Sequence, residues 1–185
     1  MKKTLLYSIL FVLPIVYFSC SSGKRALKSG NYYKASITAI ERLRSKPNKK
    51  SSQEVLKEAY PLAVEEILRD TEKVLMGYAP NKYRLAFTNY EQLNNLADQI
   101  NKSPAARKII KQVKYFTAEA NTYRQLAAEE SYQLGLRELQ KNTRASAISA
   151  YNHFINCNSL ITNYKDVNLK IEEALEIGTL IVVFE

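Results

Sequence analysis

Few residues of this sequence combine the types and the spacing that a reaction centre requires. His153, the only histidine, and Cys157 lie four residues apart, so one face of a helix would present both to a metal ion. Two ligands are too few, and Phe154 and Ile155 surround them, so we expect no metal. No Ser/His/Asp order and no glycine-rich phosphate loop is present, so we expect no enzyme, cofactor or small-molecule substrate. The remaining acidic pairs are typical of helix surfaces: Glu65-Glu66, Glu129-Glu130 and Glu172-Glu173.

Cys20 is the second candidate, and its chemistry would be acylation. It follows Lys2, Lys3 and a 14-residue apolar run over residues 5–18. A helix of that length spans about 21 Å, whereas the hydrocarbon core of a bilayer is about 30 Å thick. Pro14 also interrupts the run, so a cleaved signal peptide fits better than a spanning anchor.

The residues around this cysteine resemble the bacterial lipobox, in which a small residue precedes the cysteine that becomes the acylated N-terminus. Ser19 and Cys20 match that pattern, whereas Tyr17 and Phe18 depart from it, since an aliphatic and a small residue are usual there. The resemblance implies a signal peptide over residues 1–19 and a lipid on Cys20. The alternative is a plain signal peptide with an incidental cysteine.

Basic charge is concentrated just after the cysteine. Residues 21–50 contain nine Lys and Arg and one acid, Glu41. We expect residues 20–30 to be a lipidated N-terminus and basic linker. The charge of segment 24–50 has two open interpretations: attraction to an anionic bilayer, worth about 1 kcal/mol per residue, or a solvated linker and helix face. Nucleic acid is not expected, because an exported chain rarely meets it and the tyrosines fall at core spacing.

Helical periodicity extends over most of the chain beyond the cysteine. Gly30 is expected to end one short helix, and Asn31 to cap the next, which Pro47 stops. A second helix is expected to end near Met76, and Pro61 inside it predicts a kink or a later start.

A third long helix is expected to begin at Ser103-Pro104, a cap followed by proline in the first turn, and to continue towards Leu139. Its length favours a bend near Gly135. Opposite its apolar stripe lies a basic stripe of three residues, Arg107, Lys111 and Lys114. The stripe is either a contact surface for an acidic partner or a solvated face.

Gly30 is followed by Tyr32, Ala35 and Pro47 at spacings of two, three and twelve residues. This segment resembles the end of a tetratricopeptide repeat, where a glycine, an aromatic residue, a small alanine and a closing proline recur in that order. The resemblance implies antiparallel helix pairs stacked into a solenoid. Weaker matches to this repeat pattern occur at Tyr83, Ala86 and Tyr90, and at Ala147 and Tyr151. The alanine spacings of 51 and 61, against a regular 34, imply degenerate repeats.

The last residues, 179–185, contain five consecutive apolar, β-prone side chains from Leu180 to Phe184. One strand cannot form a sheet by itself. The segment is therefore either the first strand of a further domain or a tail that packs on the helices or pairs with another protein.

Together these features predict an all-α fold, an antiparallel helix-pair solenoid over residues 31–178 with a β-prone tail. Ser21 follows the cysteine, and no acid occurs before Glu41, which favours attachment to the outer membrane, facing the periplasm. The expected function is that of a non-enzymatic, lipid-anchored adaptor for an envelope protein or peptide. The alternative is a stalk or accessory domain of a larger lipoprotein whose activity lies beyond residue 185.

Overall fold

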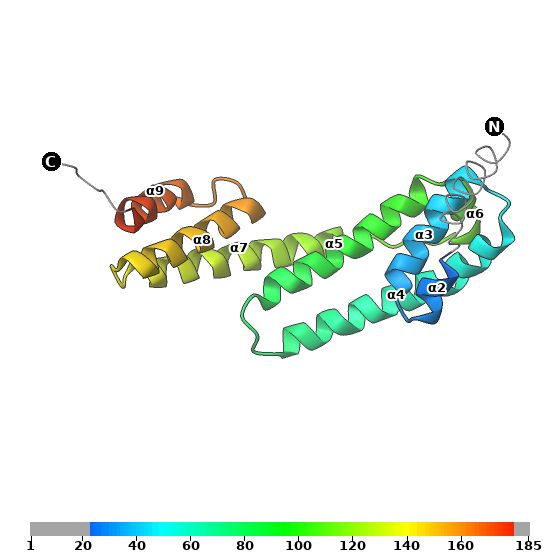
Figure 1. The fold of residues 1–185 in the computed structure, drawn as a ribbon, viewed down its shortest axis with the longest axis horizontal. Coiled ribbons are helices and arrows are strands. Elements are labelled where there is room, and N and C mark those ends of the chain that lie inside the picture. The colour runs from blue at the N-terminus through cyan, green and yellow to red at the C-terminus, as the bar shows by residue number, and fades with distance from the viewer. Residues whose placement is uncertain (1–22, 180–185) are drawn as a thin grey trace, which may run out of the picture. The chain divides into compact units, whose positions relative to one another are not determined.

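The computed structural model describes residues 23–179, and its regular elements there are all helices (Figure 1). The all-α prediction is therefore confirmed for this part of the chain. The predicted signal peptide, Cys20 and the tail from Leu180 onward lie outside the described residues. The helices are α2 (Lys24–Lys28), α3 (Tyr32–Ser45), α4 (Lys50–Met76), α5 (Lys82–Asn101), α6 (Pro104–Ile109), α7 (Thr117–Leu139), α8 (Arg144–Leu160) and α9 (Val167–Gly178).

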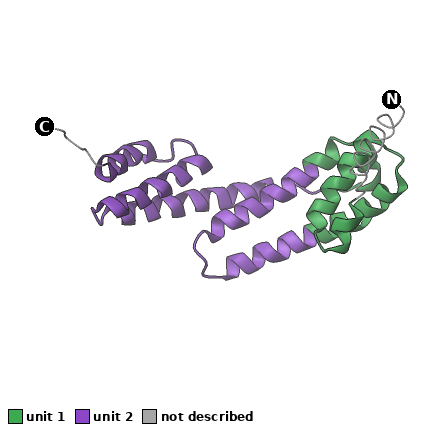
Figure 2. Ribbon diagram, in the orientation of Figure 1, with its two compact units in different colours: residues 1–63, 98–112 green, residues 64–97, 113–185 purple. Residues whose placement is uncertain are grey.

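The described residues form two compact units (Figure 2). Unit 1 comprises residues 23–63 and 98–112, and so contains α2, α3, α6, the first half of α4 and the end of α5. Unit 2 comprises residues 64–97 and 113–179, and so contains the rest of α4 and α5 together with α7, α8 and α9.

In unit 1, α3 lies against α2 and α6. Asn31 caps α3 as predicted, because its side-chain oxygen accepts the Lys34 N–H at 3.0 Å. Gly30 separates α2 from α3 with a φ of +77°, a left-handed conformation that favours glycine. The buried face of α3 consists of Ala35, Ser36, Ala39, Ile40 and Leu43.

Helix α4 begins at Lys50 and continues through Pro61 to Met76. The alternative that Pro61 delays the start of this helix is therefore wrong. Pro61 has no N–H to donate to the carbonyl of Lys57, but both residues lie on the exposed face of α4. The apolar positions of its unit 1 half are buried: Val55, Leu56, Ala59 and Ala63.

The single helix predicted from Ser103 to Leu139 is wrong. Ser103 does cap a helix, since its hydroxyl oxygen accepts the Ala106 N–H at 3.3 Å. That helix, α6, ends at Ile109, and the next seven residues are not helical. Helix α7 then begins at Thr117 and runs to Leu139.

Contacts within unit 2 hold the non-helical conformation just before α7. The N–H of Phe116 donates to the side-chain oxygen of Asn94 on α5 at 2.7 Å, so it has a partner outside the helix. The Phe116 ring is buried and lies 5.9 Å from the ring of Tyr90, measured between centroids. The start of α7 is therefore set by tertiary contacts, since no proline or glycine precedes it in the non-helical segment.

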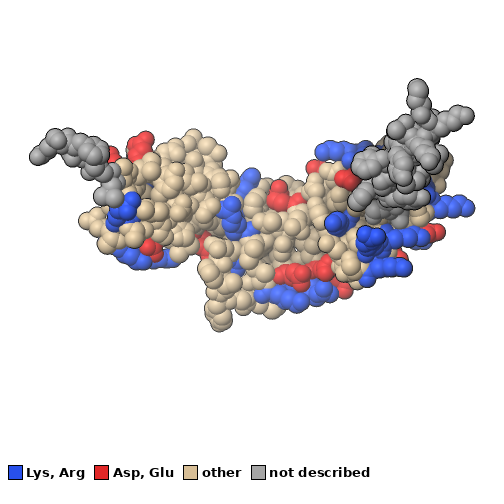
Figure 3. All heavy atoms as spheres, in the orientation of Figure 1, with Lys and Arg blue, Asp and Glu red and all other residues tan. Residues whose placement is uncertain are grey.

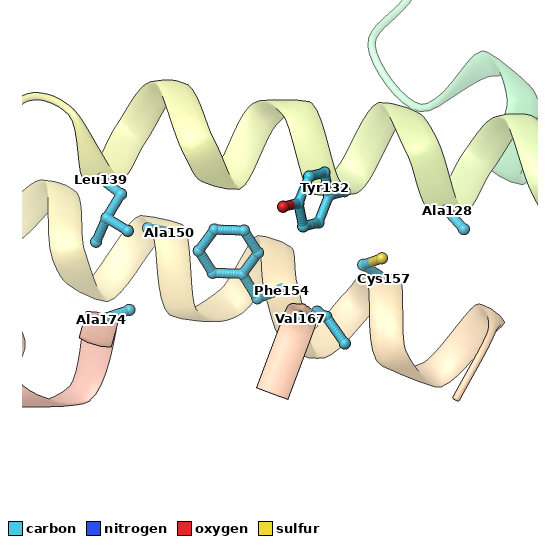
Figure 4. Close-up of a cluster of buried hydrophobic side chains, with 8 residues drawn as sticks. All are labelled: Ala128, Tyr132, Leu139, Ala150, Phe154, Cys157, Val167 and Ala174. Atoms are coloured by element: carbon cyan, nitrogen blue, oxygen red, sulfur yellow. The ribbon is translucent and has the colours of Figure 1, made fainter. Parts of the chain in front are cut away.

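Helices α7, α8 and α9 are joined by short turns, and α8 packs against both neighbours (Figures 1 and 4). Phe154 of α8 fills the core between them and is fully buried. Gly135 of α7 faces that ring, and a Cβ atom at this position would lie 2.5–2.8 Å from three of its carbons. Gly135 lies inside α7, where it permits the close approach of α8.

The close approach at Gly135 yields the first prediction. Replacing this helical glycine with alanine normally stabilises by up to about 1 kcal/mol, but the clash with a buried ring costs about 1–3 kcal/mol. We expect Gly135→Ala to lower the free energy of unfolding measured with urea. Gly178→Ala is the matched control, because its Cβ would lie 3.5 Å or more from its neighbours. Equal stability of the two variants would contradict the packing described here.

Candidate functional site

The structure separates the three basic residues predicted to form one helical stripe. Arg107 lies on α6, whereas Lys111 and Lys114 lie in the non-helical segment between α6 and α7. All three are exposed, and they share no helix face. Arg107 and Lys111 belong to unit 1, and Lys114 belongs to unit 2.

Lys114 adjoins a row of aromatic rings in unit 2. Its ammonium nitrogen lies 4.5 Å from the centroid of the Phe116 ring, a cation–π contact. Tyr90 continues the row, and Tyr123 of α7 stacks on both Tyr90 and Tyr83 of α5, with centroids 5.5 and 6.4 Å apart. Lys114 therefore has a local structural role beside these rings.

Unit 1 contains a pocket of about 400 Å³ bounded by α3, the α3–α4 turn, the start of α4 and α6. Its charged residues are Arg44 and Lys108, and its amides are Asn48 and Gln53. Among the described residues, no Asp or Glu lines it. The other lining residues are Leu43, Pro47, Ser103, Pro104, Ala105 and Ile109, so the walls are mainly apolar.

Hydrogen bonds fix part of the polar lining. The Nη2 atom of Arg44 donates to the backbone oxygen of Gln99 at 3.1 Å and to its side-chain Oε1 at 2.5 Å. Because a guanidinium carries five N–H groups, Arg44 retains further donors. Gln53 donates from Nε2 to the carbonyl of Pro47 at 3.0 Å, which leaves its Oε1 as an acceptor. The exposed side chain of Lys108 makes no hydrogen bond or ion pair with a described residue.

Electrostatics distinguish unit 1 from unit 2. Within the described residues, unit 1 has fourteen Lys and Arg against four Asp and Glu, whereas unit 2 has eleven against thirteen. On the face drawn in Figure 3, Lys and Arg side chains gather over the part that Figure 2 assigns to unit 1. The excess of positive charge therefore extends beyond the basic segment 24–50 to residues contributed by α6 and its surroundings.

A second pocket of unit 1, of about 340 Å³, has a balanced lining. Lys24 and Lys28 face Glu54 and Glu58 there, and Lys24 lies 3.8 Å from Glu54. Its cations therefore have carboxylates beside them. The pocket that contains Arg44 and Lys108 has none, which makes it the stronger candidate for an acidic ligand.

Unit 2 contains a polar cluster between α7 and the α8–α9 turn. Glu129 accepts hydrogen bonds from the Tyr164 hydroxyl and from the Lys165 ammonium, each at 2.5 Å. The Tyr132 hydroxyl donates to Asp166. The Lys165 ammonium also lies 4.9 and 5.3 Å from the ring centroids of Tyr132 and Tyr164. These contacts connect the start of α9 to α7.

The titration of this cluster favours a structural role. The hydrogen bond from Lys165, followed by that from Tyr164, lowers the pKa of Glu129 to about 2. The hydrogen bond to Asp166 raises the pKa of Tyr132 to about 12, and burial, followed by the bond to Glu129, raises that of Tyr164 to about 12. None of these groups changes charge near neutral pH, so none suits proton transfer there.

The pair His153 and Cys157 lies on α8, where Cys157 is fully buried. Burial raises the pKa of the Cys157 thiol to about 11 and lowers that of His153. Within residues 23–179, no group of three or more His, Cys, Asp or Glu side chains gathers where a metal could bind. Over the same residues, every helix is too short or too polar to cross a bilayer.

Sequence reasoning missed both the unit 1 pocket and the Glu129 cluster. The pocket joins residues 43–53 to residues 103–109, and the cluster joins Glu129 to residues about 35 positions later. No short-range spacing links such positions. The one signal present in the sequence was the positive charge, whose grouping depends on which segments form unit 1.

Comparisons with protein-family descriptions, curated proteins and solved structures give no match for this chain. Its function is therefore argued from its own residues.

The Glu129 cluster predicts a specific acid dependence of stability. The folded pKa lies below the ordinary value of 4.5, so the stabilisation is complete above that pH and is lost as pH falls towards about 2. In urea unfolding followed by circular dichroism, Glu129→Gln should remove this part of the acid dependence. Glu173→Gln, which breaks only the local pair with Lys170, should retain it. If Glu129→Gln keeps the slope of the unchanged protein below pH 4.5, the cluster does not stabilise the fold.

Proposed function

We propose that this chain is a lipid-anchored helical adaptor that binds a protein or peptide partner in the bacterial envelope. The observation that carries the proposal is the excess of positive charge in unit 1, which has a pocket that Arg44 and Lys108 line with no carboxylate from the described residues. Mixed apolar and polar pockets of this volume are typical of ligand sites. Positive potential also speeds the encounter with an acidic partner and favours it over a basic one.

A degenerate helical-repeat architecture is part of this proposal. Its support is the burial of the alanines that occupy the small position of the repeat pattern, Ala35, Ala86 and Ala147. The glycine of the detailed match, Gly30, has the positive φ of a helix-ending residue. Stacked helix pairs of this kind leave extended surfaces on which partners bind.

The anchor is proposed on the sequence around Cys20. A lipid there would hold the basic unit 1 near a bilayer, because only three residues separate Cys20 from the start of α2 at Lys24. Attachment to the outer membrane with the helices in the periplasm agrees with the absence of an acid between Ser21 and Glu41. Several acyl chains give stable attachment, since each buried CH₂ contributes about 0.8 kcal/mol.

The contact surface in this proposal includes Arg107 and Lys111, which belong to the basic unit. Lys114 stays in the proposed surface as an exposed cation, although it lies beside the aromatic row of unit 2. Their separation between α6 and the following segment means that a partner would meet them as single charges, not as a helical stripe.

The anchor yields a direct prediction. Labelled palmitate should be incorporated into the protein in growing cells, and the protein should fractionate with membranes. Cys20→Ala should abolish the label and release or misprocess the chain, whereas Cys157→Ala should retain the label because that thiol is buried. Palmitate absent from the unchanged protein would refute the anchor.

The adaptor proposal is tested by recovery of the partner after cross-linking in cells. Replacing Arg107, Lys111 and Lys114 with Glu should leave the helical circular dichroism intact, since exposed substitutions usually change stability by about 0.5 kcal/mol or less each. It should reduce recovery of an envelope protein, and the difference from the unchanged protein should become smaller at higher salt, because salt screens exposed charges. The matched control carries Glu at Lys73, Arg124 and Lys141, exposed residues of unit 2. Equal recovery by both triple variants would remove the three residues from the contact surface. Turnover of a substrate that one point substitution abolishes would refute the adaptor.

A further inference from the structure

The unit 1 pocket selects for negative charge on its ligand. Lys108 and Arg44 both line it, Lys108 has no carboxylate partner, and Arg44 is oriented by the backbone and side chain of Gln99. A neutral or basic ligand would leave these cations partly desolvated without compensation. A ligand carboxylate would supply the missing counter-charge.

The apolar walls indicate a ligand that has an apolar part in addition to its negative charge. Leu43, near the C-terminal end of α3, is fully buried, and the other apolar lining residues are Pro47, Pro104, Ala105 and Ile109. A volume of about 400 Å³ exceeds that of one side chain, so it would admit an acidic residue together with an apolar neighbour.

The amides of the pocket distinguish a peptide from a phosphate group. Gln53 keeps its Oε1 as an acceptor, and Asn48 offers both a donor and an acceptor. A phosphate at neutral pH offers mainly acceptor oxygens, so these protein acceptors would lack partners. A peptide backbone supplies N–H donors as well as carbonyl acceptors and would match both.

We propose that the pocket formed by α3, the α3–α4 turn and α6 binds an acidic segment of a partner protein, with a Glu or Asp at Lys108 and Arg44 and an apolar side chain against the walls. This inference rests on the proposed adaptor function and assigns it a site. Neither the buried face of α3 nor the balanced pocket at Lys24 and Glu54 offers this combination.

The test measures fluorescence anisotropy with the full chain in a non-ionic detergent. The probe is a fluorescein-labelled octapeptide of alternating Glu and Leu, compared with its Gln/Leu counterpart. We expect the Glu/Leu peptide to bind at least about tenfold more tightly, and Lys108→Glu to weaken it roughly tenfold, because a like charge then faces the ligand. The matched control is Lys34→Glu, an exposed unit 1 residue outside the pocket, which should change affinity less than about twofold.

A second variant separates the effect of the pocket from the effect of the overall charge of the protein. Ala105→Phe fills the pocket without altering charge and should weaken the Glu/Leu peptide by a similar factor. Equal losses in Lys108→Glu and Lys34→Glu, or unchanged binding in Ala105→Phe, would overturn the site. Displacement of the peptide by phosphatidylglycerol dissolved in the same detergent, with this displacement lost in Lys108→Glu, would instead assign the pocket to a lipid phosphate and refute the peptide.

The failure of this site and the failure of the adaptor function give different results. Suppose that the Glu/Leu peptide does not bind but the unchanged protein still cross-links to an envelope protein. Peptide binding at the pocket is then refuted, and the adaptor function is retained with a different contact surface. If the peptide binds at the pocket but no envelope protein is recovered from cells, the adaptor function is refuted and the site stands.

Discussion

Close contact between helices through small side chains is the constraint on which this structure depends. Of the 28 buried hydrophobic residues in the described part of the chain, 13 are alanines. Alanine lets helix backbones approach, so packing contacts replace the burial of large side chains. The contact of Gly135 with the Phe154 ring is the extreme case, because even one added carbon would overlap the ring. Polar contacts such as those of Glu129 then reinforce α9, whose own buried face contains only Val167 and Ala174.

Charge distinguishes the surfaces of the two units. In unit 2, acidic and basic residues are nearly equal in number, and Glu129, Glu138 and Glu173 each pair with a lysine. Unit 1 has too few carboxylates for its cations. Positive charge that the fold does not neutralise is available to a partner, and Lys108 places part of it at a concave site. The proposed function rests on this imbalance, since positive charge provides both attraction to an acidic partner and selectivity for it.

Local signals predicted local structure well. Asn31 and Ser103 cap helices because side-chain oxygens meet the first free N–H groups, and that geometry depends on adjacent residues alone. The interruption before α7 was not predictable in this way, because Phe116 and Asn94 meet only after α5 and α7 have packed. The pocket was not predictable for the same reason: Lys108 is adjacent to the predicted Arg107, but residues that line the pocket with it, such as Arg44 and Gln53, come from α3 and α4. At Gly135, where the sequence predicted a bend, the structure shows a packing requirement that the sequence did not reveal, because the Phe154 ring comes from another helix.

Site-specific photocross-linking in living cells tests whether the unit 1 pocket binds an acidic segment of a partner protein. A benzoylphenylalanine in place of Asn48, at the pocket, is compared with one in place of Leu126, an exposed residue of unit 2. Mass spectrometry then identifies the peptide attached at each position. We expect position 48 to capture a protein segment rich in Glu or Asp beside apolar residues, and position 126 not to capture it. Capture of the same segment at both positions, or of lipid alone at position 48, would contradict binding of an acidic segment at the pocket.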